Sequence, residues 1–226
     1  MTNLTMLVHN RPRLTKQALE SLDCTAGSGV FVSILDDASD DPEIAKVLDG
    51  RCVTRNEESR GTGAARNQII KWTDANVGRG DYLYLSDNDV YFHKDWHGTL
   101  IDAYEAAWKQ GFRVLGAYNH PFHIPIAKVS VGNGWEVHEV LALALQSMLM
   151  RWEVWDKYGP FRETAPGRVC DGEDVDFGNA IRADGFCLGV ISPALVVNCG
   201  VTNSFGQPIP GADLVRTQAP QGVIVE

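Results

Sequence analysis

The sequence has few cysteines, and none of them lie in the spacing of a metal-binding or redox pair. Five cysteines are scattered over 226 residues, and no Cys-x-x-Cys occurs. An odd, scattered set argues against a disulfide framework and against a structural zinc site. We therefore expect reduced thiols and a cytoplasmic protein.

Long apolar runs are also missing. No stretch approaches the roughly 18 consecutive apolar residues of a membrane-spanning helix, and the first residues show no basic segment followed by an apolar one. We expect neither a signal peptide nor a membrane span. We also find no basic amphipathic helix of the kind that lies on a membrane surface.

Positive charge is in short supply. Lysine and arginine number 20 against 29 aspartates and glutamates, which gives a net charge of −9. This balance argues against general binding to nucleic-acid phosphates, although a local basic groove remains compatible with it. The hydrophobic content of 44% and charged content of 22% are typical of a globular protein.

The first half of the chain alternates between short apolar segments and segments with helical periodicity. This alternation predicts an α/β fold with a mostly parallel central sheet flanked by helices. The expected strands, with a helix between each successive pair, are Leu4–Val8, Val30–Leu35, Cys52–Thr54, Tyr82–Ser86 and Arg113–Ala117. The expected helix caps are Asp41 and Asp95.

The second half is less regular. The segment 141–150 is ambiguous between helix and strand, whereas Glu173–Ala183 has a partial apolar face and predicts a helix. Short strands are expected at Phe186–Ile191 and Ala194–Val197. The tail from Gly206 has no periodicity and is expected to be a loop.

Polar clusters follow three of the expected strands, at His9-Asn10, at Asp36-Asp37 and at Asp87-Asn88-Asp89. In parallel sheets, ligands collect beyond the carboxyl ends of the strands. Two carboxylates at i and i+2 point to the same side, so they can hold one divalent cation and leave positions for a phosphate. A polar turn with an Asx cap is the alternative for the last cluster.

Several segments, in this order, resemble the GT-A fold glycosyltransferases of the family 2-like type. The segments are Leu7-Val-His-Asn-Arg-Pro12, Ile34-Leu-Asp-Asp-Ala-Ser39, Arg60-Gly-Thr-Gly-Ala-Ala-Arg-Asn67, Leu85-Ser-Asp-Asn-Asp-Val90 and Gly172-Glu-Asp-Val-Asp-Phe177. The resemblance covers roughly residues 3–200. It implies a metal-dependent, inverting transfer of a sugar from a nucleoside diphosphate sugar to an acceptor hydroxyl, with Mn²⁺ or Mg²⁺ as cofactor.

The resemblance also implies a division of the chain. We expect a single GT-A catalytic domain over residues 1–205, followed by a C-terminal arm or loop over 206–226. Within the domain, residues 1–117 would bind the nucleotide sugar and residues 118–205 the acceptor. The acceptor class stays open between a soluble glycan, a protein and a modified nucleobase.

By resemblance, donor binding falls on the ends of the first strands. His9 and Arg11 would line the nucleotide pocket, and Asp37 would bind the nucleobase or ribose. A helix-capping loop is the alternative for the acidic segment that contains Asp37. In the glycine-rich segment, Gly63 allows close backbone approach, and Arg60 and Arg66 would contact the diphosphate or sugar. The alternative there is a helix start with solvated arginines.

The resemblance assigns the cation to the acidic segment after the fourth strand. Asp87 and Asp89 would be metal ligands, and Asp87 and Asn88 would also touch the donor nucleotide. Many relatives carry a histidine after the late strand, but this chain has Asn198-Cys199-Gly200 there. The third metal ligand is therefore open between Asn198, Cys199 and water.

The catalytic base has to lie opposite the leaving group, so it must come from a different segment than the metal ligands. The resemblance places it at Asp174, with Glu173 as the alternate. Both residues are also compatible with a role as acidic helix caps.

Two other functions remain as alternatives. The first is a nucleotidyltransferase, although no glycine-rich loop with a following Lys or Arg comes after the first strand. The second is a nucleotide-sugar-binding module without catalysis.

Overall fold

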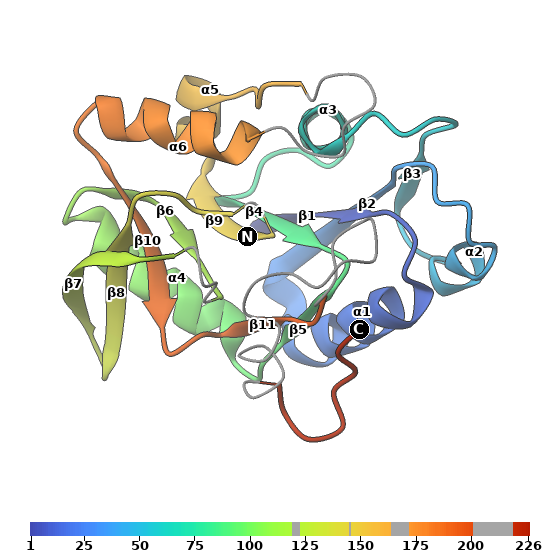
Figure 1. The fold of residues 1–226 in the computed structure, drawn as a ribbon, viewed down its shortest axis with the longest axis horizontal. Helices are drawn as coiled ribbons and strands as arrows, with labels where there is room; N and C mark the ends of the chain where they lie inside the picture. The colour runs from blue at the N-terminus through green and yellow to red at the C-terminus, as the bar shows by residue number, and fades with distance from the viewer. Residues whose placement is uncertain (119–122, 145, 164–171, 201–218) are drawn as a thin grey trace.

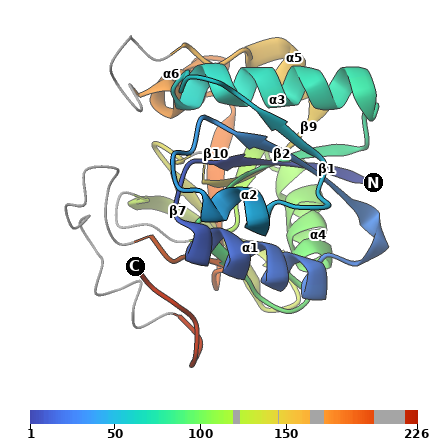
Figure 2. The ribbon, with the colours of Figure 1, turned by 90° about the vertical axis from the view of Figure 1, so that its right-hand side faces the viewer.

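A central sheet lies between two layers of helices in the computed structural model, which describes residues 1–118, 123–144, 146–163, 172–200 and 219–226 (Figure 1). Helices α3, α5 and α6 cover one face, and α1, α2 and α4 cover the other (Figure 2). The helices are α1 (Pro12–Thr25), α2 (Glu43–Val47), α3 (Thr62–Asn76), α4 (Trp96–Trp108), α5 (Trp152–Tyr158) and α6 (Glu173–Ala183).

The main sheet has the strand order β3-β2-β1-β4-β9-β6-β10-β8-β7. Of these strands, only β8 and β9 run against the direction of the others, so the prediction of a mostly parallel sheet flanked by helices is confirmed. The strands are β1 (Thr2–Val8), β2 (Val30–Asp36), β3 (Val53–Arg55), β4 (Tyr82–Asp87), β6 (Phe112–Gly116), β7 (Pro125–Gly132), β8 (Trp135–Val140), β9 (Ser147–Arg151) and β10 (Cys187–Ser192).

The core sits on both faces of the central strands. In β4, Leu83, Tyr84 and Leu85 are all fully buried, because helices cover both sides of the sheet at that point. Full burial of such a side chain contributes roughly 1.5–3 kcal/mol relative to exposure. The continuous apolar run that ends in Asp87 is therefore a packing requirement, and its acidic end is carried to the rim of the sheet.

The segment 141–150, which the sequence left ambiguous, contains most of β9. This strand pairs antiparallel with β4 on one side and β6 on the other. Its register places Ser147 opposite Ser86, beside the end of β4. The choice of a strand comes from these partners, because a short apolar run has no periodicity of its own that separates helix from strand.

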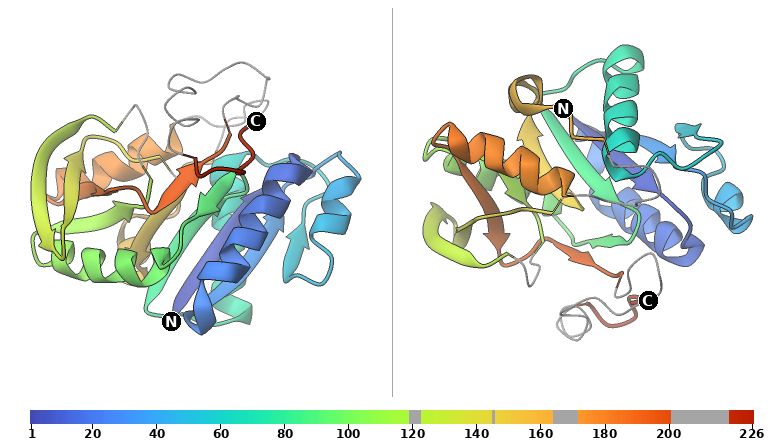
Figure 3. Two further views of the ribbon diagram at one scale, coloured as in Figure 1. Left: turned by 90° about the horizontal axis from the view of Figure 1, so that it is seen from below. Right: turned by 45° about the horizontal axis from the view of Figure 1, so that its top comes forward.

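A small second sheet was only half expected from the sequence. It joins β5 (Val90–Phe92) to β11 (Val196–Asn198) in antiparallel register, with Val90 opposite Asn198. The two strands lie side by side in both views of Figure 3. We had predicted β11 but not β5, since β5 is short and follows the acidic segment without a turn signal. This pairing places residues 198–200 next to Asp89, whose carbonyl accepts a hydrogen bond from the Cys199 amide.

The two predicted helix caps differ from the observed ones. Asp95 does occupy the position before α4, but it has a left-handed backbone and its side chain makes no capping hydrogen bond. Asp41 lies one residue outside the cap position of α2, where Pro42 stands. The Asp41 carboxylate still accepts a hydrogen bond of 2.9 Å from the Glu43 amide.

The C-terminal arm was expected over residues 206–226, and of these only 219–226 are described. This part has no helix or strand, in agreement with the expected loop. It packs on α1, where the Gln17 side chain bonds both backbone groups of Ile224. No helix within the described parts of the chain is long and apolar enough to cross a bilayer. The division into residues 1–117 and 118–205 stays a prediction.

Candidate functional site

The loops after β1, β2 and β4 are tied together at one edge of the sheet. His9 Nδ1 donates to the Asp37 carbonyl at 2.9 Å, and the Asn10 amide donates to Ser39 Oγ at 2.7 Å. Asn88 Nδ2 in turn donates to the Asn10 carbonyl at 2.9 Å. The three polar clusters of the sequence therefore meet, as the parallel pairing of these strands requires.

The backbone after β1 has an unusual conformation. Asn10 and Arg11 both have positive φ angles, of 56° and 60°. Residues other than glycine rarely adopt this left-handed conformation, and they do so mostly where surrounding contacts hold them. Here the turn starts α1 at Pro12 and aims the Arg11 guanidinium at the Asp89 carboxylate.

Asp89 is a buried carboxylate with one oxygen engaged and one left over. Its Oδ2 forms an ion pair with Arg11 Nη1, while its buried Oδ1 has no hydrogen-bond partner among the described residues. Burial raises the pKa of Asp89 to about 6, and the nearby charge of Asp87 adds to this rise. A buried, partly unsatisfied carboxylate of this kind is suited to receive a cation.

Asp87 is paired with a fully buried arginine. Arg66 of α3 is 0% exposed, and its Nη2 bonds Asp87 Oδ1 while its Nη1 donates to the Ser86 carbonyl at 2.8 Å. Burial lowers the pKa of Arg66, and the charges of Asp87 and Glu173 oppose that shift. The structure thus places Arg66 behind the acidic segment, away from any solvent-exposed surface.

The donor set at this edge fits a hard divalent cation. Asp87 and Asp89 supply neighbouring carboxylate oxygens. A cation would interact favourably with the Asp89 oxygen that has no hydrogen-bond partner among the described residues. Among the described residues, no group of three or more His, Cys, Asp and Glu side chains forms a metal site.

The candidates for a third ligand lie next to this pair but are occupied. Asn198 Oδ1 accepts from the Gly200 amide at 2.9 Å, and its Nδ2 donates to Gln146 Oε1 at 2.6 Å. Burial raises the pKa of the Cys199 thiol to about 12. The choice of a third ligand among Asn198, Cys199 and water stays a prediction.

Asp37 organises the loop that follows β3. Its carboxylate accepts hydrogen bonds from Asn56 Nδ2 at 2.7 Å, from Ser59 Oγ at 2.8 Å and from the Arg60 amide at 3.0 Å. This loop lines a hollow of about 390 Å³ formed by residues 55–60. Arg60, the last residue of this loop, is exposed. The sequence did not reveal that Asp37 would be held so tightly by its own chain.

The start of α3 holds a segment that leads toward α6. Asn67 bonds both backbone groups of Phe161, each at 2.9 Å. A side chain on Gly63 would overlap with the Arg162 carbonyl, so close backbone approach is required there, though to the chain itself. This contact by itself accounts for a glycine at position 63. The predicted contact of Gly63 with the nucleotide sugar stays a prediction.

Asp174 stands in the first turn of α6, which points toward the end of β4 (Figure 3). It is half-buried, and burial raises its pKa, with the charge of Glu173 adding to the rise. The adjacent Glu173 is only 3% exposed. Of the two predicted bases, Asp174 is the more exposed.

Tyr118 is a buried residue within electrostatic range of the acidic groups of the site, and the sequence analysis did not single it out. Burial raises the pKa of its hydroxyl well above the usual range, and three carboxylates add to that rise: Asp87, Asp89 and Asp174. The metal-side and base-side carboxylates therefore lie around one buried tyrosine. Its position just after β6 was the only sequence signal, and a single tyrosine there is not informative.

Comparison with known proteins decides the family. Residues 4–120 match the family model described as Glycosyl transferase family 2. The chain belongs to this family. The matched range includes the loops after β1, β2 and β4 and the start of α3, but it ends before α6. No curated protein matches the chain.

Several solved structures are similar to this chain in fold. S. aureus TarS in complex with UDP-GlcNAc aligns with a TM-score of 0.60 and 19% identity, over 86% of this chain and 57% of that one. Mannosyltransferase PcManGT from Pyrobaculum calidifontis, with GDP-Man and Mn²⁺, aligns at 0.58 and 13%, over 85% and 54%. GalNAc-T7 with UDP, GalNAc and Mn²⁺ aligns at 0.64 and 15%, over 87% and 42%.

These alignments confirm the predicted GT-A fold. The chain spans less than two-thirds of the length of each of these structures. The likeness therefore extends to the catalytic-domain architecture, while the site residues rest on the geometry described above.

Gly200→Ala is expected to destabilise the protein by about 1–3 kcal/mol, the usual cost of an added group in a packed site. The new methyl group would overlap with Asp89 Oδ2 and crowd Arg11 Nη1. Urea unfolding measures the change. Gly98→Ala is the control: it lies inside α4 with open space around it, so alanine should stabilise by up to about 1 kcal/mol. Equal effects of the two substitutions would contradict the described packing.

Proposed function

We propose that this chain transfers a sugar from a nucleoside diphosphate sugar to an acceptor hydroxyl, with a divalent cation and with inversion at the sugar carbon. The observation that carries the proposal is the half-satisfied, buried carboxylate of Asp89 beside Asp87, within electrostatic range of the same tyrosine as Asp174. Family 2 membership and the GT-A fold support it.

Asp87 and Asp89 would hold Mn²⁺ or Mg²⁺. The solved mannosyltransferase and GalNAc-T7 contain Mn²⁺ together with a nucleotide, which supports a cation here. When bound, such a cation would neutralise the charge that develops on the leaving diphosphate. The carboxylate pair would position it, and Arg11 would move or share Asp89 as the cation enters.

The donor nucleotide would occupy the edge between the loops after β1 and β3. The hollow lined by residues 55–60 adjoins Asp37, whose carboxylate fixes this loop through Asn56 and the Arg60 amide and so would shape the pocket for a base or ribose. His9 lies against the Asp37 carbonyl and the exposed Arg60 stands at the rim. Arg60 would thus be the accessible cation for a phosphate.

Asp174 would act as the general base. It would take the proton of the acceptor hydroxyl while that oxygen forms its bond to the sugar carbon, and the bond to the diphosphate oxygen breaks on the other side. Burial, which raises the pKa of Asp174, makes the carboxylate a stronger base than an exposed aspartate. Glu173, buried beside Arg66, is left to a structural role.

The reaction class is tested by incubating the protein with Mn²⁺ and a panel of nucleotide sugars, including UDP-GlcNAc and GDP-mannose. Release of the nucleoside diphosphate is expected. Asp89→Ala should abolish both this release and the Mn²⁺-dependent rise in melting temperature, because the buried cation ligand is lost. Release of pyrophosphate in a parallel incubation with a nucleoside triphosphate and a sugar 1-phosphate would indicate a nucleotidyltransferase, and binding of a nucleotide sugar without any turnover would indicate a binding module.

Asp174→Asn should keep donor binding and lower transfer by about 10²–10⁴-fold, since the amide cannot accept the acceptor proton. Kinetics with a donor found in the panel, together with a binding titration, separate the two effects. Asp184→Asn is the matched control: it removes an exposed carboxylate at the other end of α6 that pairs with Lys157. Full transfer by Asp174→Asn would show that another group is the base.

The pH dependence of transfer should show the raised pKa of Asp174. The deprotonated carboxylate is the active form, so transfer is retained above its pKa and lost as the pH falls through it. Because burial raises this pKa from 3.8, the acidic limb of kcat/KM should lie above that value. The limb should be missing in residual activity of Asp174→Asn. An unchanged limb in that variant would assign it to a different group.

A further inference from the structure

Arg66 has the most unusual environment of the charged residues near the site. It is 0% exposed and lies in the second turn of α3, beneath the end of β4. A buried guanidinium is costly unless it is paired and hydrogen-bonded. Its partners are the Ser86 carbonyl and the Asp87 carboxylate, the last two residues of β4.

A second buried carboxylate lies within electrostatic range of Arg66. Glu173, at the start of α6, is 3% exposed, and its negative charge acts on Arg66. The positive charge of Arg66 is therefore balanced by its ion pair with Asp87 and, at longer range, by Glu173.

The surroundings of Arg66 make this ion pair rigid. The next residue of the same helix, Asn67, bonds the Phe161 backbone, and Gly63, one turn earlier, packs against the Arg162 carbonyl. Arg162 in turn forms an ion pair of 2.6 Å with Asp176 of α6. The start of α3 thus contacts both sides of the site through several independent groups.

We propose that Arg66 is a positioning residue, a buried cation that fixes the Asp87 carboxylate at the end of β4 relative to the start of α3 and to the segment that α3 holds before α6. This inference deepens the proposed function and rests on it for its catalytic meaning. The planar guanidinium is needed because it directs two donors at once to Ser86 and Asp87. A lysine supplies the charge but only as a single point.

The first test uses the protein without metal. Arg66→Lys, Asp87→Asn and the double variant are compared by urea unfolding in a double-mutant cycle. The shift of the unfolding midpoint in the double variant should be clearly smaller than the sum of the two single shifts, because both substitutions break the same contact. Additive shifts would overturn the hold of Arg66 on Asp87, whatever the protein binds.

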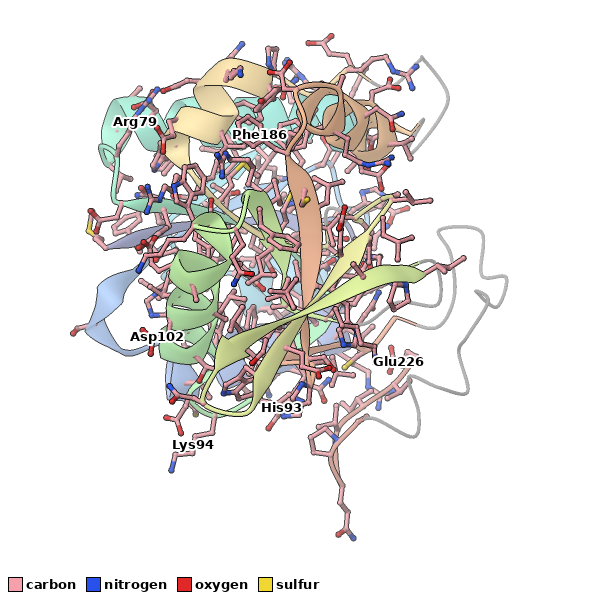
Figure 4. The ribbon with its side chains drawn as sticks, turned by 90° about the vertical axis from the view of Figure 1, so that its left-hand side faces the viewer. Arg79, His93, Lys94, Asp102, Phe186 and Glu226 are labelled. Atoms are coloured by element: carbon pink, nitrogen blue, oxygen red, sulfur yellow. The ribbon has the colours of Figure 1, made fainter. Side chains whose placement is uncertain are left out.

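The second test measures the affinity for Mn²⁺, alone and with UDP, by calorimetric titration. Arg66→Lys should weaken it by about 10- to 100-fold, the usual loss when a group that orients a metal ligand is changed. The control is Arg113→Lys. Arg113 also donates to backbone carbonyls and stacks on Trp108 and Phe186. Phe186 lies far from Glu226 (Figure 4), whose amide donates to the Cys199 carbonyl. Equal losses in both variants would overturn the proposal.

A third variant covers the case in which Arg66→Lys does not fold. Arg66→Gln places no charge in the buried position and lacks the fork that reaches both Ser86 and Asp87. It should weaken Mn²⁺ binding measurably, whereas Asp184→Asn, which removes an exposed charge at the other end of α6, should not. Identical affinities for wild type and Arg66→Gln would overturn the positioning role of Arg66.

These measurements separate the two proposals. Wild-type protein that binds no Mn²⁺, with or without UDP, would overturn the metal-dependent function, while the cycle in metal-free protein would still decide on the contact with Asp87. Wild-type protein that binds Mn²⁺ with the same affinity as Arg66→Lys would overturn only the positioning role.

Discussion

Two buried ion pairs at the end of β4 are the interactions on which the site depends. Arg66 of α3 holds Asp87, and Arg11, from the turn after β1, holds Asp89. Removing charges from water is costly, so each pair persists only because other contacts fix both partners. The left-handed turn at Arg11 and the fully enclosed Arg66 are the structural cost of keeping two carboxylates side by side.

The two pairs differ in a way that suits a metal-dependent reaction. Asp87 is paired with Arg66, which is fully buried and held in place by the surrounding residues. Asp89 is paired with Arg11, which is partly exposed, and one Asp89 oxygen has no partner in the described chain. An entering cation would therefore find one carboxylate held rigidly and another ready to exchange its partner. Gly200, packed against the second pair, keeps the space around it small.

Much of the fold was readable from the sequence because local patterns and packing agree. The apolar strands, the face of α1 and the acidic start of α6 all lie where their periodicity predicts. Two short segments, the unpredicted β5 and the ambiguous β9, take their conformation from their partner strands. Strand β5 pairs with β11, and β9 pairs with β4 and β6. Likewise, the sequence predicts that Arg66 contacts the diphosphate or sugar. Only the structure shows that Arg66 is buried and paired with Asp87.

By itself, the sequence determined the order of strands and helices, the polar residues at the strand ends and the resemblance to family 2, because these depend on residue type and spacing along the chain. The tertiary structure alone decided which charges pair, that Asp37 holds its own loop, that Glu173 is enclosed while Asp174 is accessible, and that Tyr118 lies among the carboxylates. Pairing and burial depend on which distant segments pack together, and residue spacing does not contain that information.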